Sequence, residues 1–199
     1  MSIWMWGFAA LSFLLGSIPF GLILTRFFAG KDIRVEGSRN IGATNVSRIA
    51  GFWPAGFLTF LLDALKVSSL ILLLRLYWPE PLTGVYLWSL GLVGLLGHCY
   101  SPWLGFKGGK GVAPFFGILA VLAPFTALIS AVIYGLALYI TGVGALGSLI
   151  GIFLGMAFHM ILSGVGDYFY VYVVCTLLIL VRHESNLSDL LIKSGYPDV

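Results

Sequence analysis

Long apolar runs separated by short polar stretches constrain this chain more than any other feature. The runs cover residues 3–28, 52–77, 82–97, 112–140, 146–163 and 168–181. A helix needs about 20 apolar residues to cross the hydrocarbon core of a bilayer, and most of these runs reach or approach that length. Only 10% of the 199 residues are charged, whereas about a quarter are charged in a soluble domain. The sequence therefore predicts an all-α, polytopic membrane helical bundle forming one domain, residues 1–199.

The number and direction of the spans follow from one proline and from the basic residues. The run over residues 112–140 is too long for one untilted helix and contains Pro124, which lacks a backbone N–H and disfavours helix in the residue before it. A split there predicts seven transmembrane helices, the fourth of them short. With the amino terminus outside, the cytoplasmic side then holds nine of the eleven Lys and Arg residues, as expected for inward-facing loops. The exceptions are Arg75, outside, and Lys66, within a span.

The ends of the chain fit this arrangement. The first ~25 residues lack the basic start and the small-residue cleavage site of a signal peptide, so we expect them to stay as a membrane helix. The carboxyl terminus is predicted to be cytoplasmic, together with the polar stretches at residues 29–51, 98–111 and 141–145.

The first polar stretch, residues 36–48, is dense in small hydrogen-bonding side chains. It contains two Asn, three hydroxyl residues, two Gly and two Arg. Neutral donors beside the planar fork of an arginine suit a phosphate or a carboxylate. The alternative is an ordinary polar loop.

The second polar stretch, residues 98–111, surrounds two lysines with glycines and leads into a helix expected to begin near Val112. Glycine lets the backbone approach an anion, and a helix amino terminus adds unpaired N–H groups. We therefore expect Lys107 and Lys110 to bind phosphate. The stretch is not a Walker A loop, because Gly105 and Gly109 stand one residue too close together. The alternative is a flexible basic loop that touches anionic lipid headgroups.

Two further pairs of polar residues stand out. His183 and Asn186 are three residues apart and would share one face of a helix that follows the last span. A structural histidine is the alternative there. Asp63 and Lys66, also three apart, are expected to form a structural ion pair, because an unpaired charge at membrane depth is costly.

These stretches together resemble the bacterial acyl-phosphate-dependent glycerol 3-phosphate acyltransferases, the PlsY family. The family motifs are similar to Gly-Ser-x-Asn-x-Gly-Ala-Thr-Asn-x-x-Arg at residues 37–48, to Gly-His at residues 97–98 and to Phe-Lys-Gly-Gly-Lys-Gly-Val-Ala at residues 106–113. A further motif resembles His-x-x-Asn at residues 183–186, and Leu-Asp-x-x-Lys at residues 62–66 also fits. The resemblance covers nearly the whole chain.

The resemblance implies transfer of a fatty acyl group from acyl phosphate to the first hydroxyl of glycerol 3-phosphate, which gives lysophosphatidate and phosphate. It implies no cofactor, a monomer in the bacterial cytoplasmic (inner) membrane, an active site facing the cytoplasm, and no nucleic-acid partner. On this basis the expected catalytic residues are His183, Asn186 and Ser38. The residues expected to bind substrate and phosphate are Arg48, Asn40, Asn45, Thr44, Lys107, Gly108, Gly109, Lys110 and His98.

Several positions depart from the usual family pattern, namely Arg39, Val67, Pro114, Ala145, Glu184, Asp189 and Pro197. A divergent paralogue with lowered or altered activity is therefore an alternative.

A transporter or channel for a small organic phosphate is the rival from another class. Transporters usually place polar groups near the bilayer midplane on broken helices in two related halves, whereas this chain gathers them at one interface and has no internal repeat. No metal site is predicted, because the acidic residues and histidines are scattered and Cys99 and Cys175 lack ligand spacing.

Overall fold

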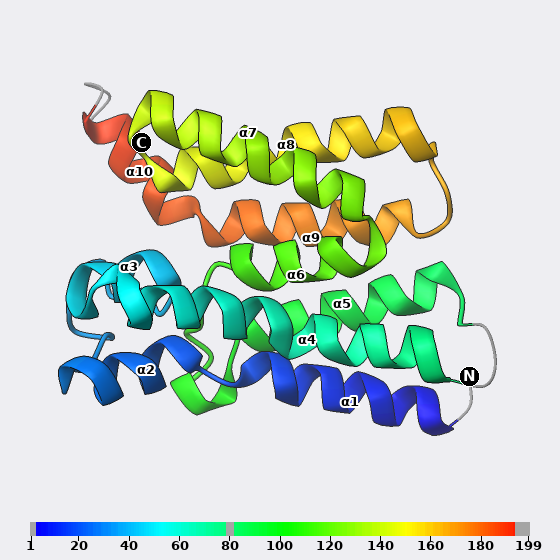
Figure 1. Cartoon of the computed structure of the whole chain (residues 1–199), viewed down its shortest axis with the longest axis horizontal. Coiled ribbons are helices and arrows are strands. Elements are labelled where there is room, and N and C mark those ends of the chain that lie inside the picture. The colour runs from blue at the N-terminus through cyan, green and yellow to red at the C-terminus, as the bar shows by residue number, and fades with distance from the viewer. Residues whose placement is uncertain (1–2, 79–81, 194–199) are drawn as a thin grey trace.

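The structure, a computed structural model, describes residues 3–78 and 82–193, and the regular elements in these ranges are helical (Figure 1). The α-helices are α1 (Ile3–Ser17), α2 (Phe20–Ala29), α3 (Ala43–Ala50), α4 (Phe57–Tyr77), α5 (Gly84–Cys99), α6 (Val112–Leu122), α7 (Pro124–Thr141), α8 (Gly144–Ser163), α9 (Phe169–Arg182) and α10 (Glu184–Lys193). An irregular turn, Phe52–Gly56, in which the backbone of Trp53 is not helical, precedes α4, and a 3-10 turn, Pro102–Leu104, follows α5. The predicted all-α fold is confirmed for these ranges.

The long helices run side by side, and most polar connections lie at one end of the bundle (Figure 1). Helix α1 packs against α5, α4 against α6, and α7 against α8. The end of the bundle that carries α3, the turn between α7 and α8, and α10 lies at the left in Figure 1 and is here called the polar end. The described amino-terminal residues lie at the opposite end.

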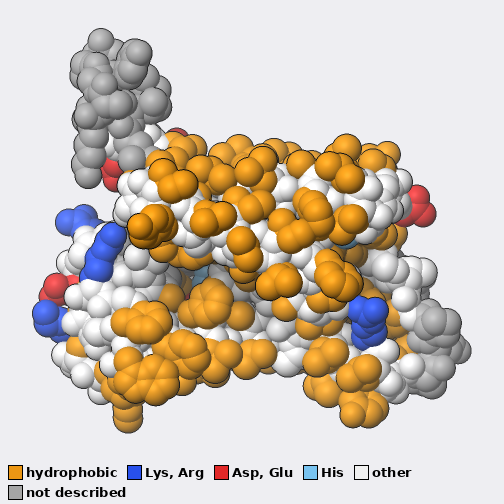
Figure 2. Space-filling view, turned by 45° about the horizontal axis from the view of Figure 1, so that its top comes forward, with side chains coloured by type: hydrophobic (Ala, Val, Ile, Leu, Met, Phe, Trp, Pro, Cys, Tyr) orange, Lys and Arg blue, Asp and Glu red, His pale blue; other side chains and the backbone are white. Residues whose placement is uncertain are grey.

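The outer surface of the bundle is apolar. Figure 2 shows hydrophobic side chains over most of one face, with the visible Lys and Arg side chains mainly toward the polar end. In water such a surface would aggregate, whereas in a bilayer it faces lipid. Four helical segments are long and apolar enough to cross a membrane: Ile3–Ala29, Phe52–Tyr77, Pro124–Thr141 and Gly144–Ser163. The chain is therefore a membrane protein.

Shorter apolar helices complete the bundle. The break predicted at Pro124 is confirmed, since α6 ends at Leu122 and α7 begins at Pro124. Helix α6 has 11 residues and is about 16 Å long at 1.5 Å per residue, roughly half a bilayer core. The count of seven spans and the outside position of the amino terminus stay predictions.

The structure differs from the sequence-based expectation in three places. The run over residues 3–28 is two helices, because Pro19 has no N–H to continue α1 and α2 begins only at Phe20. The first polar stretch, expected to be a loop, contains α3, whose Val46 is fully buried. Helix α5 extends through His98 and Cys99, which were expected in the second polar stretch.

Two glycines allow neighbouring helices to approach closely. A Cβ atom added at Gly16 of α1 would overlap the carbonyl oxygen of Gly94 in α5. A Cβ added at Gly117 of α6 would overlap the carbonyl oxygen of Ala64 in α4. Small residues serve this purpose in membrane bundles, where van der Waals packing replaces the hydrophobic effect between helices.

Candidate active site

A cavity of about 760 Å3 lies at the polar end, between α3, α4, α6, the α7–α8 turn and α10. Nine of the residues predicted to bind substrate or act in catalysis line it: Ser38, Asn40, Thr44, Asn45, Arg48, His98, Lys110, His183 and Asn186. They come from three stretches far apart in the sequence. Lys107, Gly108 and Gly109 are not among its lining residues.

Asn45 organises the first polar stretch. Its side chain is buried, its Oδ1 accepts a hydrogen bond from the Ser38 N–H at 3.0 Å, and its Nδ2 donates to the carbonyls of Glu36 at 3.1 Å and Asn40 at 2.9 Å. Gly37 has φ +56, and a Cβ there would overlap Asn45 Oδ1. Both amide donors of Asn45 are thus used inside the protein, and the side chain holds the loop that presents Ser38 and Asn40 to the cavity.

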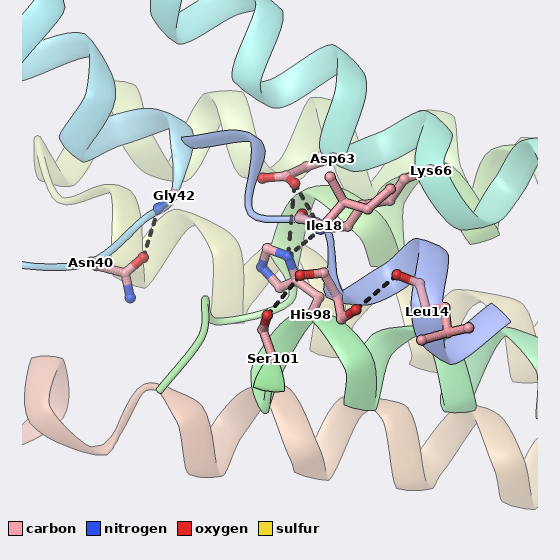
Figure 3. Close-up of polar contacts among 9 residues, drawn as sticks. Leu14, Ile18, Asn40, Gly42, Asp63, Lys66, His98 and Ser101 are labelled. Atoms are coloured by element: carbon pink, nitrogen blue, oxygen red, sulfur yellow. Dashed lines mark hydrogen bonds and ion pairs between the residues drawn. The ribbon is translucent and has the colours of Figure 1, made fainter. Parts of the chain in front are cut away.

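Asn40 has a similar local contact but keeps donors for a ligand. Its Oδ1 accepts a hydrogen bond from the Gly42 N–H at 2.8 Å, as Figure 3 shows. This contact turns the chain into α3 in the way that Asn side chains commonly do at turns. The Nδ2 group of a residue lining the cavity is then left to face a ligand oxygen.

The basic wall of the cavity consists of Arg48 in the last turn of α3 and Lys110 just before α6. Lys110 is half-buried, and burial lowers the pKa of its amine, with the neighbouring charge of Arg182 acting in the same direction. An anion bound at this wall would offset both effects. Lys107 is exposed, so its phosphate-binding role stays a prediction.

Arg182, at the end of α9, holds the glycine-rich stretch in place. Its guanidinium donates to the carbonyls of Gly108 at 3.0 Å and Gly109 at 3.2 Å and lies over the Tyr100 ring, 5.2 Å from the centroid. The N–H groups of the two glycines donate to the carbonyls of Cys99 and His98. These N–H groups are therefore occupied, and the glycines shape the wall that carries Lys110. Sequence reasoning missed Arg182, although its place next to His183 was a usable signal.

His183 and Asn186 offer acceptors where α9 meets α10. His183 is buried, and its Nδ1 lies 2.8 Å from the carbonyl oxygen of Ile179. Because a carbonyl only accepts, Nδ1 carries the hydrogen and Nε2 keeps its lone pair. Burial lowers the pKa of His183. Asn186 Oδ1 is also buried and has no hydrogen-bond partner among the described residues, which favours a ligand that donates to it.

A buried ionic cluster forms the floor of the cavity. Lys66 Nζ lies 2.8 Å from Asp63 Oδ1 and 2.8 Å from His98 Nδ1, and both Asp63 and His98 line the cavity (Figure 3). The predicted Asp63–Lys66 ion pair is confirmed. Its contact with His98 was missed, because no spacing rule links residues on two different helices.

The remaining lining is largely apolar and lies between α4, α6 and α7. It includes Phe60, Phe116, Ala131 and the side chain of Tyr134. The cavity thus has a polar half and an apolar half. Among the described residues, no group of three or more His, Cys, Asp or Glu side chains is placed to hold a metal ion.

Comparison with known proteins identifies the family. The family model described as glycerol-3-phosphate acyltransferase matches residues 6–193. This chain belongs to the glycerol-3-phosphate acyltransferase family. The resemblance predicted from the polar motifs is thereby confirmed.

Curated relatives of the acyltransferase family match over most of their length. The glycerol-3-phosphate acyltransferase of Aliarcobacter butzleri (strain RM4018) is 38% identical over 193 residues, 92% of this chain and 91% of the relative. That of Anaeromyxobacter dehalogenans (strain 2CP-C) is 42% identical over 183 residues, 91% of this chain and 90% of the relative. The fold resembles the crystal structure of PlsY (YgiH), an integral membrane glycerol 3-phosphate acyltransferase, in its glycerol 3-phosphate form. That likeness has a TM-score of 0.86 at 31% identity and covers 96% of this chain and 93% of the other.

The departures of this acyltransferase from the family pattern fall in different places. Ala145 and Asp189 line the cavity, so their side chains can contact a bound ligand. Arg39 lies outside it and has φ +58, a conformation that glycine adopts without strain. Glu184 is exposed in the first turn of α10, and Pro197 lies outside the described residues.

Proposed function

We propose that this chain transfers a fatty acyl group from acyl phosphate to the first hydroxyl of glycerol 3-phosphate, giving lysophosphatidate and phosphate in phospholipid synthesis. The observation that carries the proposal is the convergence of three distant polar stretches on one cavity that also has an apolar half. Family membership supports the reaction. The forms in which PlsY was crystallised are named for glycerol 3-phosphate and lysophosphatidic acid, an acceptor and a product of this kind.

The polar half of the cavity suits the phosphate groups. Arg48 provides a planar fork and Lys110 a compact ammonium, and both line the cavity. Ser38 and Asn40 add neutral donors on the same side as Arg48. Two phosphates, one on each substrate, would therefore meet cationic and neutral donors without a metal ion.

The apolar half suits the fatty chain. Phe60, Phe116 and Ala131 belong to the apolar helices α4, α6 and α7. A fatty chain lying between these helices would be removed from water along its length. Each buried CH2 group would then stabilise the bound state by about 0.8 kcal/mol. Acyl phosphate would then enter sideways from the membrane, with its phosphate at the polar end.

The chemistry needs mainly positioning. The hydroxyl oxygen of glycerol 3-phosphate attacks the carbonyl carbon of the acyl phosphate, the bond from that carbon to the phosphate oxygen breaks, and phosphate leaves. Holding the reacting atoms about 3 to 3.5 Å apart supplies much of the rate gain. His183 Nε2 and Asn186 Oδ1 accept from the hydroxyl groups and orient the attack. The proton is taken by His183 or by the departing phosphate.

The membrane arrangement completes the proposal. Seven spans with the amino terminus outside would place the polar end, and with it the active site, on the cytoplasmic side of the bacterial inner membrane. The distribution of Lys and Arg supports this direction. A monomer is the proposed active form.

Alanine variants at Lys110 and His183, with Gly135→Ala as the control, test the site in proteoliposomes. Lys110→Ala should lose most activity with acyl phosphate and glycerol 3-phosphate, whereas Gly135→Ala, a change with open space around it, should keep it. A wild-type rate for Lys110→Ala would refute the phosphate site. His183→Ala tells the two proton acceptors apart, because a variant that keeps most of its kcat leaves only the departing phosphate for that role.

A further inference from the structure

The ammonium group of Lys66 has its full set of hydrogen-bond partners. An ammonium carries three donors and no acceptor. Lys66 Nζ lies 2.8 Å from Asp63 Oδ1, 3.1 Å from the Ile18 carbonyl oxygen and 2.8 Å from His98 Nδ1. Each donor of the buried Lys66 therefore has one acceptor, and His98 Nδ1 must be the third.

The proton shared by this cluster belongs on Lys66. An amine binds a proton about four orders of magnitude more tightly than an imidazole in model peptides. Lys66 is also the nearer cation to Asp63, since His98 Nδ1 is 3.8 Å from the carboxylate. A hydrogen on His98 Nδ1 would point at the ammonium. The ring is therefore neutral and carries its one hydrogen on Nε2.

The free nitrogen of His98 faces the glycine-rich stretch. A Cβ added at Gly109 would overlap His98 Nε2 and would lie 2.7 Å from Cε1. Any other residue at this position would cover the donor. Gly109 also comes directly before Lys110, which lines the same cavity as His98.

We infer that the buried Asp63–Lys66 pair is a positioning device that fixes His98 as a neutral Nε2–H donor, and that this donor binds a phosphate oxygen of the substrate. The inference rests on the proposed function for the identity of that substrate. It separates the two cavity histidines by role. The Lys66 ammonium donates to His98 Nδ1, so the hydrogen of the His98 ring lies on Nε2 and that nitrogen donates. In His183 the Nδ1–H donates to the Ile179 carbonyl, so Nε2 accepts.

The tautomer is measurable without any turnover. The chain has three histidines, so 15N-histidine NMR of the protein in nanodiscs, with His98→Gln to assign the signals, resolves the ring. We expect a bare Nδ1 and a protonated Nε2 in the wild type, and a mixture of tautomers in Lys66→Met. A wild-type ring protonated at Nδ1, or at both nitrogens, would overturn the inference even if Lys66→Met failed to fold.

Inorganic phosphate tests the ligand. Its addition should shift the Nε2 signal of His98 in the wild type and in the matched control Gly135→Ala, and should leave it unmoved in Gly109→Ala. In turnover assays Gly109→Ala should raise the KM of glycerol 3-phosphate or acyl phosphate about ten- to hundredfold, the effect of one hydrogen bond to a charged group, with kcat within about twofold.

The outcomes separate this inference from the proposed function. No phosphate-dependent shift in the wild type, or a loss in kcat with unchanged KM for both substrates in Gly109→Ala, would refute the donor role. A clear shift in a wild-type protein that forms no lysophosphatidate would support the donor role and refute the acyl transfer.

Discussion

Asn45→Ala should reduce activity strongly, although the Asn45 amide is used inside the protein. The substitution removes one hydrogen bond to the Ser38 N–H and two from Nδ2 to the carbonyls of Glu36 and Asn40. Each is worth about 1 kcal/mol net, so the loop loses about 3 kcal/mol of local stability. Because 1.4 kcal/mol is about tenfold in an equilibrium, the population of the ordered loop, and with it kcat/KM, should fall up to about a hundredfold.

Two measurements check this reasoning. Hydrogen exchange should show faster exchange at the Ser38 amide in Asn45→Ala, and kcat/KM should fall in the same preparation. Ser89→Ala is the control, since Ser89 makes a single local bond to the Val85 carbonyl on α5, away from the cavity. If Asn45→Ala lost activity while the Ser38 amide stayed protected, Asn45 would be a direct substrate ligand and the loop-holding role would be wrong.

Four further predictions address strain, charge, protonation and packing. Arg39→Gly should raise the free energy of unfolding by about 1 to 2 kcal/mol, because φ +58 is strained for a side chain; an unchanged thermal midpoint would contradict it. Asp189→Asn should lower the KM of the phosphate substrates about two- to fivefold, because it removes from the cavity lining a negative charge that repels phosphate. An equal or higher KM would argue against Asp189 lying beside the bound phosphate. Burial lowers the pKa of His183, and its acceptor form is the neutral one. The kcat/KM of the wild type divided by that of His183→Gln should therefore stay constant on acidification to about pH 6.5 and decrease only below that pH. An increase of this ratio in acid would mean that His183 acts in its protonated form. Gly117→Ala should cost about 1 to 3 kcal/mol of stability through overlap with Ala64, whereas Gly135→Ala should cost nothing measurable, and equal thermal midpoints would refute the close helix contact.

The sequence predicted most of the helices because lipid solvation imposes one simple rule on length and polarity. For that reason the apolar runs over residues 52–77 and 146–163 were correctly predicted to be membrane helices. Pro124 marked a real helix boundary, while the same signal at Pro19 was overlooked within one apolar run. Helix α3 escaped prediction because its polar residues satisfy local turn contacts, and the burial of Val46 and Asn45 reveals its packing.

The sequence predicted residues that lie around one cavity, but not which atoms each of them contacts. Nine of the predicted residues line one cavity. They could be predicted because the motifs that contain them are recognisable in the sequence. That Asn45 holds a loop, or that Lys66 contacts His98 across two helices, depends on which atoms meet in space. Spacing along one helix showed the Asp63–Lys66 pair because that contact is local.

The most direct test of the account is a product analysis of the purified protein in liposomes, supplied with synthetic acyl phosphate and labelled glycerol 3-phosphate. We expect lysophosphatidate and inorganic phosphate in a one-to-one ratio, with no product when acyl-CoA replaces acyl phosphate. Uptake of glycerol 3-phosphate into the liposomes without acylation, or acylation that requires acyl-CoA, would contradict it.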